Sequence, residues 1–172
     1  GWDGKSPELL GFRNYLHAYL FSGVTTIMDM GNIPPYILQI RDAVKSGRIL
    51  GPQIYCVGPL IDGVDAQWPA FSVSIASIRQ IPGLVRRLKD RHVTFLKAYK
   101  GLSFRQLDQL VDDGKKSGLD VIVDQGFLNA SLDLCTLNIA AFAHVPGQRR
   151  ITDKTLDLMK RNGIRNMTTL SV

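Results

Sequence analysis

Short apolar and β-branched runs alternate with amphipathic segments along the whole chain, and this alternation limits the folds that the chain can adopt. Helical spacing and helix end signals predict helices at 9–20, 34–47, 83–91, 103–118, 129–138 and 152–163. The runs between them predict strands at 24–30, 53–57, 93–99, 120–124, 140–145 and 166–172. Strands that alternate with helices form a parallel sheet with right-handed crossovers. The chain is therefore predicted to be an α/β protein with six parallel strands in sequential order.

Two parallel architectures fit this order. A doubly wound open sheet would carry a glycine-rich phosphate turn after an early strand, but the chain has no Gly-x-Gly-x-x-Gly. A (β/α) barrel has its chemistry at the ends of several strands, where this chain has Asp29, Lys97, Asp124 and His144. We therefore expect a TIM-barrel type of fold. A closed barrel needs eight strands and about 250 residues, so six strands in a single domain of 172 residues predict an incomplete barrel.

Lys97 stands inside the predicted strand from Val93 to Tyr99, among residues that are mostly apolar. Buried lysines are rare unless they are paired or coordinate another group. This one lies near the carboxyl end of its strand, where barrels have their active sites, so it is the first candidate functional residue. The alternative is an edge position from which the amine reaches water. Tyr99, two residues on, shares the same face; its phenol would polarise a substrate carbonyl or, alternatively, pack at the barrel rim.

The segment from Gly58 to about Ala76 is rich in glycine, proline and aspartate and contains Trp68 and Phe71. Loops of this length are usually functional or disordered, and we expect this one to shape a pocket. It contains no known recognition motif, so the substrate cannot be read from it. Asp29 is expected to cap the next loop rather than to contact a substrate.

Composition and charge exclude several classes of partner. With 45% hydrophobic and 8% aromatic residues, the chain can form a real core. The net charge of +6 comes from dispersed basic pairs without interleaved aromatic residues, so no nucleic-acid partner is expected. No apolar run approaches the roughly 18 residues that span a bilayer, and no secretory signal is visible. Cys56 and Cys135 match no metal spacing, which predicts buried free thiols in a reducing, cytoplasmic environment. His17 and His92 are expected at the surface or in helix packing.

Several motifs occur in a defined order: Gly-Val-Thr-Thr-Ile-Met-Asp-Met-Gly (23–31), Ile-Arg-Asp-Ala-Val-Lys-Ser-Gly-Arg-Ile-Leu-Gly-Pro-Gln-Ile (40–54), Leu-Lys-Ala-Tyr (96–99), Ala-His-Val (143–145) and Thr-Thr-Leu-Ser-Val (168–172). Together they cover nearly the whole chain. They resemble the metal-dependent amidohydrolase superfamily, in particular its imidazolonepropionase-like and prolidase-like branch. On that family, the predicted strands correspond to barrel strands two to seven.

The resemblance implies a metal site and a reaction. Members of the family carry a His-x-His pair on the first strand, a carboxylated lysine on the fourth, histidines on the fifth and sixth, and an aspartate on the eighth. The lysine carbamate bridges two divalent metals. Lys97 corresponds to that lysine and His144 to the sixth-strand histidine. The implied cofactor is a divalent metal, zinc first and manganese second. The implied substrate is a small-molecule amide or a dipeptide-like compound, cleaved at a carbon-nitrogen bond.

The chain departs from the family pattern in three places. It has no His-x-His pair, and the eighth-strand aspartate would lie beyond residue 172. Asp124 stands where the family has its fifth-strand histidine. Because carboxylate oxygens bind zinc and manganese, Asp124 is a candidate metal ligand; the alternative is that this substitution marks a lost site.

The departures leave two hypotheses open. The chain is either part of a metal-dependent amidohydrolase, with catalysis incomplete or impaired, or a non-catalytic remnant that acts as an oligomeric binding or assembly module. Without first and eighth strands, the second and seventh would be open sheet edges, which recruit partners. We therefore expect a homo-oligomer, whether the sequence is an excerpt of a longer protein or a natural truncation.

Overall fold

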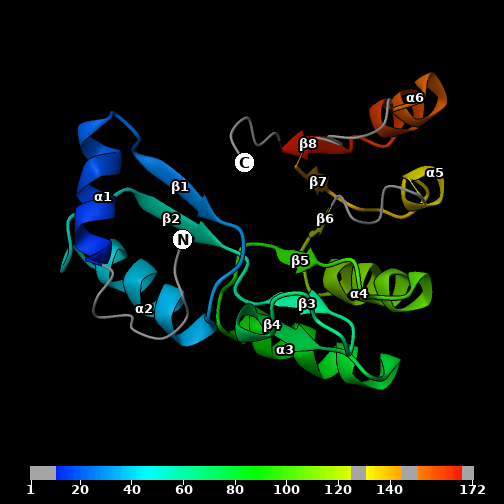
Figure 1. Cartoon of the computed structure of the whole chain (residues 1–172), viewed down its shortest axis with the longest axis horizontal. Coiled ribbons are helices and arrows are strands. Elements are labelled where there is room, and N and C mark those ends of the chain that lie inside the picture. The colour runs from blue at the N-terminus through cyan, green and yellow to red at the C-terminus, as the bar shows by residue number, and fades with distance from the viewer. Residues whose placement is uncertain (1–10, 125–130, 145–150, 168–172) are drawn as a thin grey trace.

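The computed structural model describes residues 11–124, 131–144 and 151–167 (Figure 1). Its α-helices are α1 (Phe12–Phe21), α2 (Pro34–Lys45), α3 (Ile81–Asp90), α4 (Phe104–Lys116), α5 (Ser131–Leu134) and α6 (Asp153–Arg161). Its strands are β1 (Thr26–Asp29), β2 (Gln53–Cys56), β3 (Leu60–Asp62), β4 (Ser72–Ser74), β5 (Leu96–Ala98), β6 (Val121–Asp124), β7 (Ala141–Ala143) and β8 (Arg165–Met167). Two short 3-10 helices are η2 (Pro69–Phe71) and η3 (Ile78–Gln80). The predicted alternation of strands and helices is confirmed.

The strands form a six-stranded sheet in the order β4-β3-β5-β6-β7-β8 and a two-stranded sheet of β1 and β2, and every pair is parallel. All six predicted strands are present, as β1, β2, β5, β6, β7 and β8, and the described residues contain two more. The two additional strands, β3 and β4, lie in the segment 58–76 that was expected to be a loop. Glycine and proline precede β3 and glycine follows it, and such residues predict a loop rather than a strand.

The path from β2 to β3 is one strand interrupted at Gly58, which has a φ of 73°. Before the interruption the Thr94 amide donates to the carbonyl oxygen of Cys56 (2.8 Å), and after it the Tyr99 amide donates to that of Ile61 (2.8 Å). Both halves therefore run beside the segment that contains β5, while β1 pairs with the first half and β4 with the second. The predicted sequential order is thus confirmed for every strand except β4, which is an additional edge strand.

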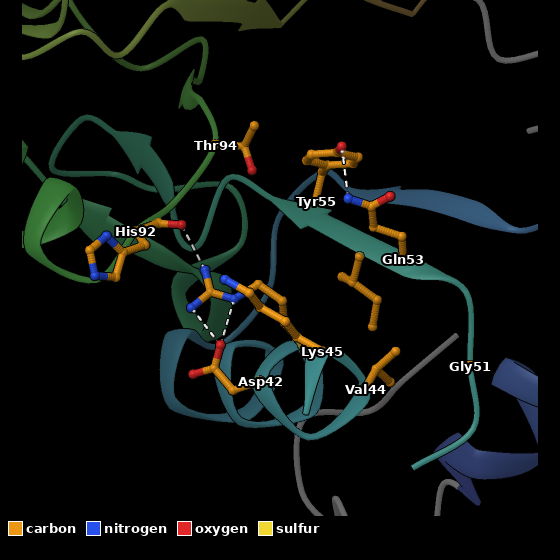
Figure 2. Close-up of a pocket in the computed structure, with 10 residues that line it drawn as sticks. Asp42, Val44, Lys45, Gly51, Gln53, Tyr55, His92 and Thr94 are labelled. Atoms are coloured by element: carbon orange, nitrogen blue, oxygen red, sulfur yellow. Dashed lines mark hydrogen bonds and ion pairs between the residues drawn. The ribbon is translucent and has the colours of Figure 1, made fainter. Parts of the chain in front are cut away.

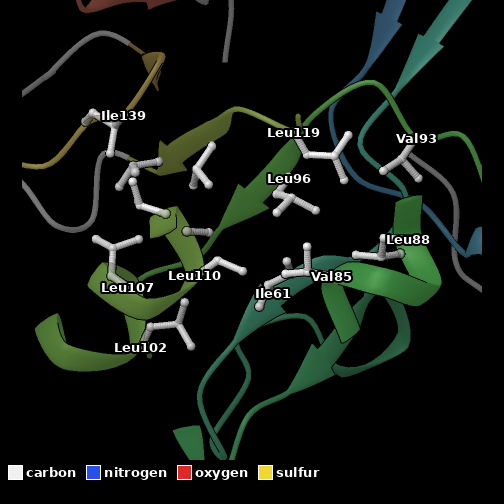
Figure 3. Packing of buried hydrophobic residues seen from close by; sticks show 14 of the residues in the cluster. Ile61, Val85, Leu88, Val93, Leu96, Leu102, Leu107, Leu110, Leu119 and Ile139 are labelled. Atoms are coloured by element: carbon white, nitrogen blue, oxygen red, sulfur yellow. The ribbon is translucent and has the colours of Figure 1, made fainter. Parts of the chain in front are cut away.

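The main hydrophobic core lies between the sheet and its helices (Figure 3). Helix α4 begins where Ser103 and Gln106 form a reciprocal capping box, and it buries Leu107 and Leu110. Facing these residues, Leu96 on β5 is fully buried. Removing apolar side chains from water is the dominant favourable term in folding, so this layer holds β5 and its neighbours in place.

The opposite face of the sheet carries a second, smaller apolar cluster. Ile122 on β6 and Ala141 and Ala143 on β7 form its buried part, and partly buried residues pack against it: Met28, Met30, Phe95 and Met167. Side chains alternate between the two faces of a strand, so Ile122 belongs to this cluster while Val121 and Val123 belong to the main core. Because residues from β1 and β8 pack against the same cluster, the sheet is curved as in a barrel (Figure 1).

Both cysteines are buried and unbridged, which confirms the prediction of buried free thiols. In the part of the chain that the structure describes, no helix is both long and apolar enough to cross a membrane.

Candidate functional site

The structure places Lys97, Asp124 and His144 on three adjacent strands. Lys97 is the middle residue of β5, Asp124 is the last residue of β6, and His144 directly follows β7. The register pairs Lys97 with Ile122 and Asp124 with Ala143. The Nε2 atom of His144 lies 3.8 Å from Oδ2 of Asp124. These three side chains therefore gather near the carboxyl ends of β5, β6 and β7.

Lys97 is buried rather than at the strand edge, because β5 lies between β3 and β6 and the residue is only 4% exposed. Its Nζ atom lies 5.7 Å from the centroid of the Tyr99 ring. Burial lowers the pKa of the Lys97 amine, and the negative charges of Asp124 and Asp29 oppose this shift. Since the desolvation is the larger effect, the neutral amine is easier to reach here than in an exposed lysine.

Asp29 caps the turn after β1, as expected. Its carboxylate accepts hydrogen bonds from the Gly31 amide (3.2 Å) and from Nδ2 of Asn32 (3.0 Å). Burial raises the pKa of the Asp29 carboxyl, while these two hydrogen bonds and the charge of Lys97 lower it. Asp29 therefore also belongs to the electrostatic surroundings of Lys97, which its position at a strand end could have indicated.

The backbone of His144 is unusual, with a φ of 73°. Ala141 and Ala143 face the small inner cluster, so strict alternation would turn the next side chain toward the helices. The left-handed conformation interrupts that alternation, and Nε2 comes near Asp124 while the His144 amide donates to the carbonyl oxygen of Met167 (2.8 Å). Non-glycine residues in this region are uncommon and cluster at functional sites.

A cavity of about 370 Å³ lies beside Lys97 and Tyr99, within the size range of small-molecule sites. Its other lining residues are Met30, Gly31, Leu60, Trp68 and Phe71. Lys97 and Tyr99 thus share a face of the chain, as predicted. The segment 58–76 contributes three of the lining residues, so the prediction that it shapes a pocket is confirmed.

Tyr99 is held by a hydrogen bond in which Nε1 of Trp68 donates to the phenol oxygen (3.1 Å). Burial raises the pKa of the Tyr99 phenol, and the charges of Asp124 and Asp62 act in the same direction, against the hydrogen bond from Trp68. The phenol therefore keeps its proton at neutral pH. Because the indole uses a lone pair of the oxygen, the hydroxyl hydrogen is available for donation to a ligand.

Asp62 is a residue of this region that the sequence did not single out. It is 1% exposed, and its Oδ1 atom accepts hydrogen bonds from the amides of Gly63 (2.9 Å) and Gly101 (2.8 Å). Its Oδ2 atom accepts one from the Gln67 amide (3.1 Å). Asp62 therefore ties the segment after β3 to the loop after β5, and both of these segments contribute residues to the cavity.

A larger cavity of about 600 Å³ lies elsewhere, between α2, β2 and the segment before β5 (Figure 2). Arg41 forms an ion pair with Asp42 (2.9 Å) and donates to the carbonyl oxygen of His92 (2.7 Å). Gln53 and Thr94 place this cavity at the amino ends of the strands, where barrels have structural rather than catalytic residues. We therefore assign the candidate site to the smaller cavity. His17 and His92 are exposed, as expected.

No protein-family model matches the sequence, and no curated protein matches it either. Solved structures do match the fold. Molinate hydrolase matches with a TM-score of 0.76 at 20% identity, over 95% of this chain and 44% of that one. A prolidase in complex with N-methylphosphonate-L-proline matches with a TM-score of 0.79 at 17% identity, over 97% of this chain and 48% of that one. The fold is that of the amidohydrolases.

A third structure, a Xaa-Pro dipeptidase with methionine bound in its active site, matches with a TM-score of 0.70 at 20% identity. It is covered over 44% of its length, and this chain over 89%. The chain thus spans less than half the length of each of these three proteins. At this level of identity the likeness establishes the fold, and the expected incomplete TIM-barrel type of α/β fold is confirmed.

The separation of Asp124 and His144 would allow both side chains to bind one metal ion. Two donors about 2.1 Å from a tetrahedral metal lie about 3.4 Å apart, and the observed 3.8 Å between Asp124 and His144 is close to this value. Within residues 11–124, 131–144 and 151–167, no group of three or more His, Cys, Asp or Glu could hold a metal ion. The described donor set fits a divalent metal only if Lys97 supplies the third ligand.

Proposed function

We propose that the chain is part of a metal-dependent hydrolase that cleaves carbon-nitrogen bonds in small amides or dipeptide-like compounds. The observation that carries the proposal is a buried lysine beside Asp124 and His144, at the carboxyl ends of adjacent strands and next to a cavity of small-molecule size. The names of similar structures support the reaction class, since they include a prolidase, a dipeptidase and an amidohydrolase.

The metal, zinc or else manganese, would be held by Lys97 as a carbamate, by Asp124 and by His144. When bound, a divalent metal lowers the pKa of water to about 7 and polarises a substrate carbonyl. A carbamate forms when the neutral amine attacks carbon dioxide, making a nitrogen-carbon bond and releasing a proton. The lowered pKa of Lys97 favours this reaction, because it makes the neutral amine more available.

Tyr99 is the proposed catalytic residue among the chain's own side chains. Its phenol faces the cavity and keeps its proton at neutral pH. By donating a hydrogen bond to the carbonyl oxygen of a bound amide, the phenol would stabilise the negative charge that develops there. The hydrogen bond from Trp68 fixes the phenol oxygen in place, and Met30 and Leu60 supply apolar surface beside it.

The alternative function is a non-catalytic remnant that acts as an oligomeric binding or assembly module. The observation that favours it is Asp124, an aspartate where the resemblance implies a histidine. Both functions can be separated by one measurement of metal affinity.

Calorimetric titration of zinc, at near-neutral pH with bicarbonate present, tests the proposed function. If Asp124 is a ligand, Asp124→Ala will lower zinc affinity by about tenfold or more, and Asp124→His will bind no better than the native chain. If the aspartate instead weakened an ancestral site, Asp124→His will raise the affinity. Near-neutral pH is needed because the ligands must lose their protons to bind.

Asp120→Ala is the matched control for this titration. Asp120 is exposed and precedes β6 at its other end, so its loss should leave zinc binding unchanged. Equal and weak binding by the native chain and both Asp124 variants would contradict the hydrolase proposal and favour the non-catalytic module.

We also propose that the chain associates with copies of itself through its edge strands. Among the described residues, β1 pairs only with β2, and β8 pairs only with β7. Unpaired strand edges associate readily, and a lysine on an edge discourages this. Light scattering should therefore detect a dimer or larger assembly, and Asn166→Lys, on exposed β8, should shift it toward monomer. A native monomer that persists at all concentrations would contradict the proposal.

A further inference from the structure

The cavity beside Lys97 has one polar side and one apolar wall. Lys97 and Tyr99 provide its polar side chains, both from the β5 segment. The apolar wall comes from other parts of the chain: Met30 after β1, Leu60 on β3, and Trp68 and Phe71. Small-molecule sites are mostly apolar, with a few polar groups that set orientation. This cavity therefore suits a ligand that has a polar amide at one end and a bulky apolar group at the other.

Hydrogen bonds hold Trp68 in position, but packing leaves much of its side chain exposed. Its indole nitrogen donates to Tyr99 (3.1 Å), and its carbonyl oxygen accepts from the Phe71 amide (2.9 Å). Even so, 49% of its surface is exposed. An indole that is hydrogen-bonded at one end and half exposed offers a flat apolar surface to a ligand.

The hydrogen bonds of Asp62 extend this restraint to the backbone of the segments that carry Trp68 and Tyr99. One carboxylate oxygen binds the amides of Gly63 and Gly101, and the other binds the amide of Gln67, the residue before Trp68. Trp68 and Tyr99 are thus tied together through side chains and through backbone. A site that is ordered in advance loses less conformational entropy when a ligand binds.

We propose that Trp68 and Phe71 form a subsite for an aromatic or bulky apolar side chain, so that the site takes N-acylated aromatic amino acids in preference to small ones. The inference rests on the proposed function for the kind of compound. Trp68 determines the specificity, because it combines the largest exposed apolar surface of the wall with a fixed position.

The test compares two probes that share an amide and a carboxylate and differ by one benzyl group. N-acetylphenylalanine and N-acetylglycine are titrated separately into the metal-free chain by calorimetry. Burial of a phenyl ring is worth about 1.5–3 kcal/mol, so we expect the phenylalanine compound to bind at least about tenfold more tightly. Because no metal is needed, the result does not depend on catalysis.

Three variants locate the preference. Trp68→Ala should abolish it, and Trp68→Phe should keep most of it because a ring remains. Tyr19→Ala is the matched control, since Tyr19 is an aromatic residue of similar exposure (45%) on α1, and it should leave the preference unchanged. If Trp68→Ala does not fold, the comparison of Trp68→Phe with the native chain still tests the subsite.

Tyr99→Phe tests the positioning of Trp68. The substitution removes the oxygen that accepts the indole N–H, so Trp68 should become more mobile. In a Trp2→Phe background, where Trp68 is the one remaining tryptophan of the sequence, we expect stronger acrylamide quenching of fluorescence and a several-fold smaller preference for the phenylalanine probe. A variant that lost only packing would not show this change in quenching.

Two results would overturn the inference: equal affinity of the native chain for both probes, or a preference that survives Trp68→Ala. These outcomes are distinguishable from failure of the proposed function. If the chain binds no zinc but prefers the aromatic probe, the subsite is supported and the hydrolase proposal is contradicted. If the chain binds zinc but does not prefer the aromatic probe, the hydrolase proposal is supported and the subsite is contradicted.

Discussion

Gly63→Ala will destabilise the chain by about 3 kcal/mol or more, because the new methyl group would occupy space filled by backbone. A Cβ atom on Gly63 would overlap the carbonyl oxygen of Gly101 and lie 2.7 Å from its carbonyl carbon. Neither atom can rotate away as a side chain can. Relief would require the two loops to separate, and that would break hydrogen bonds to Asp62 at Gly63 or at Gly101.

Urea unfolding of Gly63→Ala and Gly83→Ala measures this effect against a matched control. Gly83 lies in α3, and the nearest atom to its added Cβ is Nη1 of Arg87 at 3.6 Å, the end of a flexible side chain. Alanine in a helix is favoured over glycine by about 0.5–1 kcal/mol, so Gly83→Ala should be slightly stabilising. Similar stability of the two variants would show that the loops at Gly63 and Gly101 do not approach as closely as described.

Lys97→Met will stabilise the chain by about 2 kcal/mol at neutral pH, in buffer free of metal and bicarbonate. Burying a charge is costly, and a buried charge is often replaced by an apolar side chain with a gain in stability. Asp124 and Asp29 offset only part of that cost, since burial is the largest influence on the pKa of Lys97. A residue that lowers stability in this way is typical of a functional site.

The pH dependence of this gain provides a second measurement. Burial lowers the pKa of Lys97 in the folded chain, so between that pKa and the ordinary lysine pKa the unfolded chain binds more protons. The stability of the native chain relative to Lys97→Met therefore rises with pH across that window. The stability gained by Lys97→Met should be greatest below the pKa that Lys97 has in the folded chain, and it should vanish near the ordinary lysine pKa. Tyr99 also titrates at alkaline pH, but it is present in both proteins and cancels in the difference.

Unfolding of both proteins from neutral to alkaline pH tests the sign. A gain that does not change with pH would show that folding does not shift the pKa of Lys97. A loss of stability on substitution would show that the charges of Asp124 and Asp29 outweigh the cost of burial.

Leu96→Ala, on the adjacent residue of β5, should lower the free energy of unfolding by about 2–5 kcal/mol, because Leu96 is fully buried in the main core.

The predicted helices and strands depend on patterns a few residues apart, which is why they could be read from the sequence. The capping box of Ser103 and Gln106 starts α4, and the spacing of Leu107 and Leu110 defines its buried side. The motif around Lys97 identified the fold through its resemblance to the amidohydrolases. Asp62 was missed, although it ends an apolar run as Asp29 and Asp124 do, and that shared position was a usable signal.

The sequence by itself therefore determined the alternation of strands and helices, the parallel α/β class and the positions of Lys97, Asp124 and His144 in or directly after neighbouring strands. Only the tertiary structure decided that β3 and β4 are strands, since they lie in a segment with loop-like composition and become strands by pairing with each other and, for β3, with β5. It alone decided that Lys97 is buried, because β3 and β6 flank its strand. The contact of Trp68 with Tyr99 was likewise decided by folding, since it joins residues 31 positions apart. Local periodicity is encoded by neighbouring residues, whereas burial and contacts depend on which distant segments pack together.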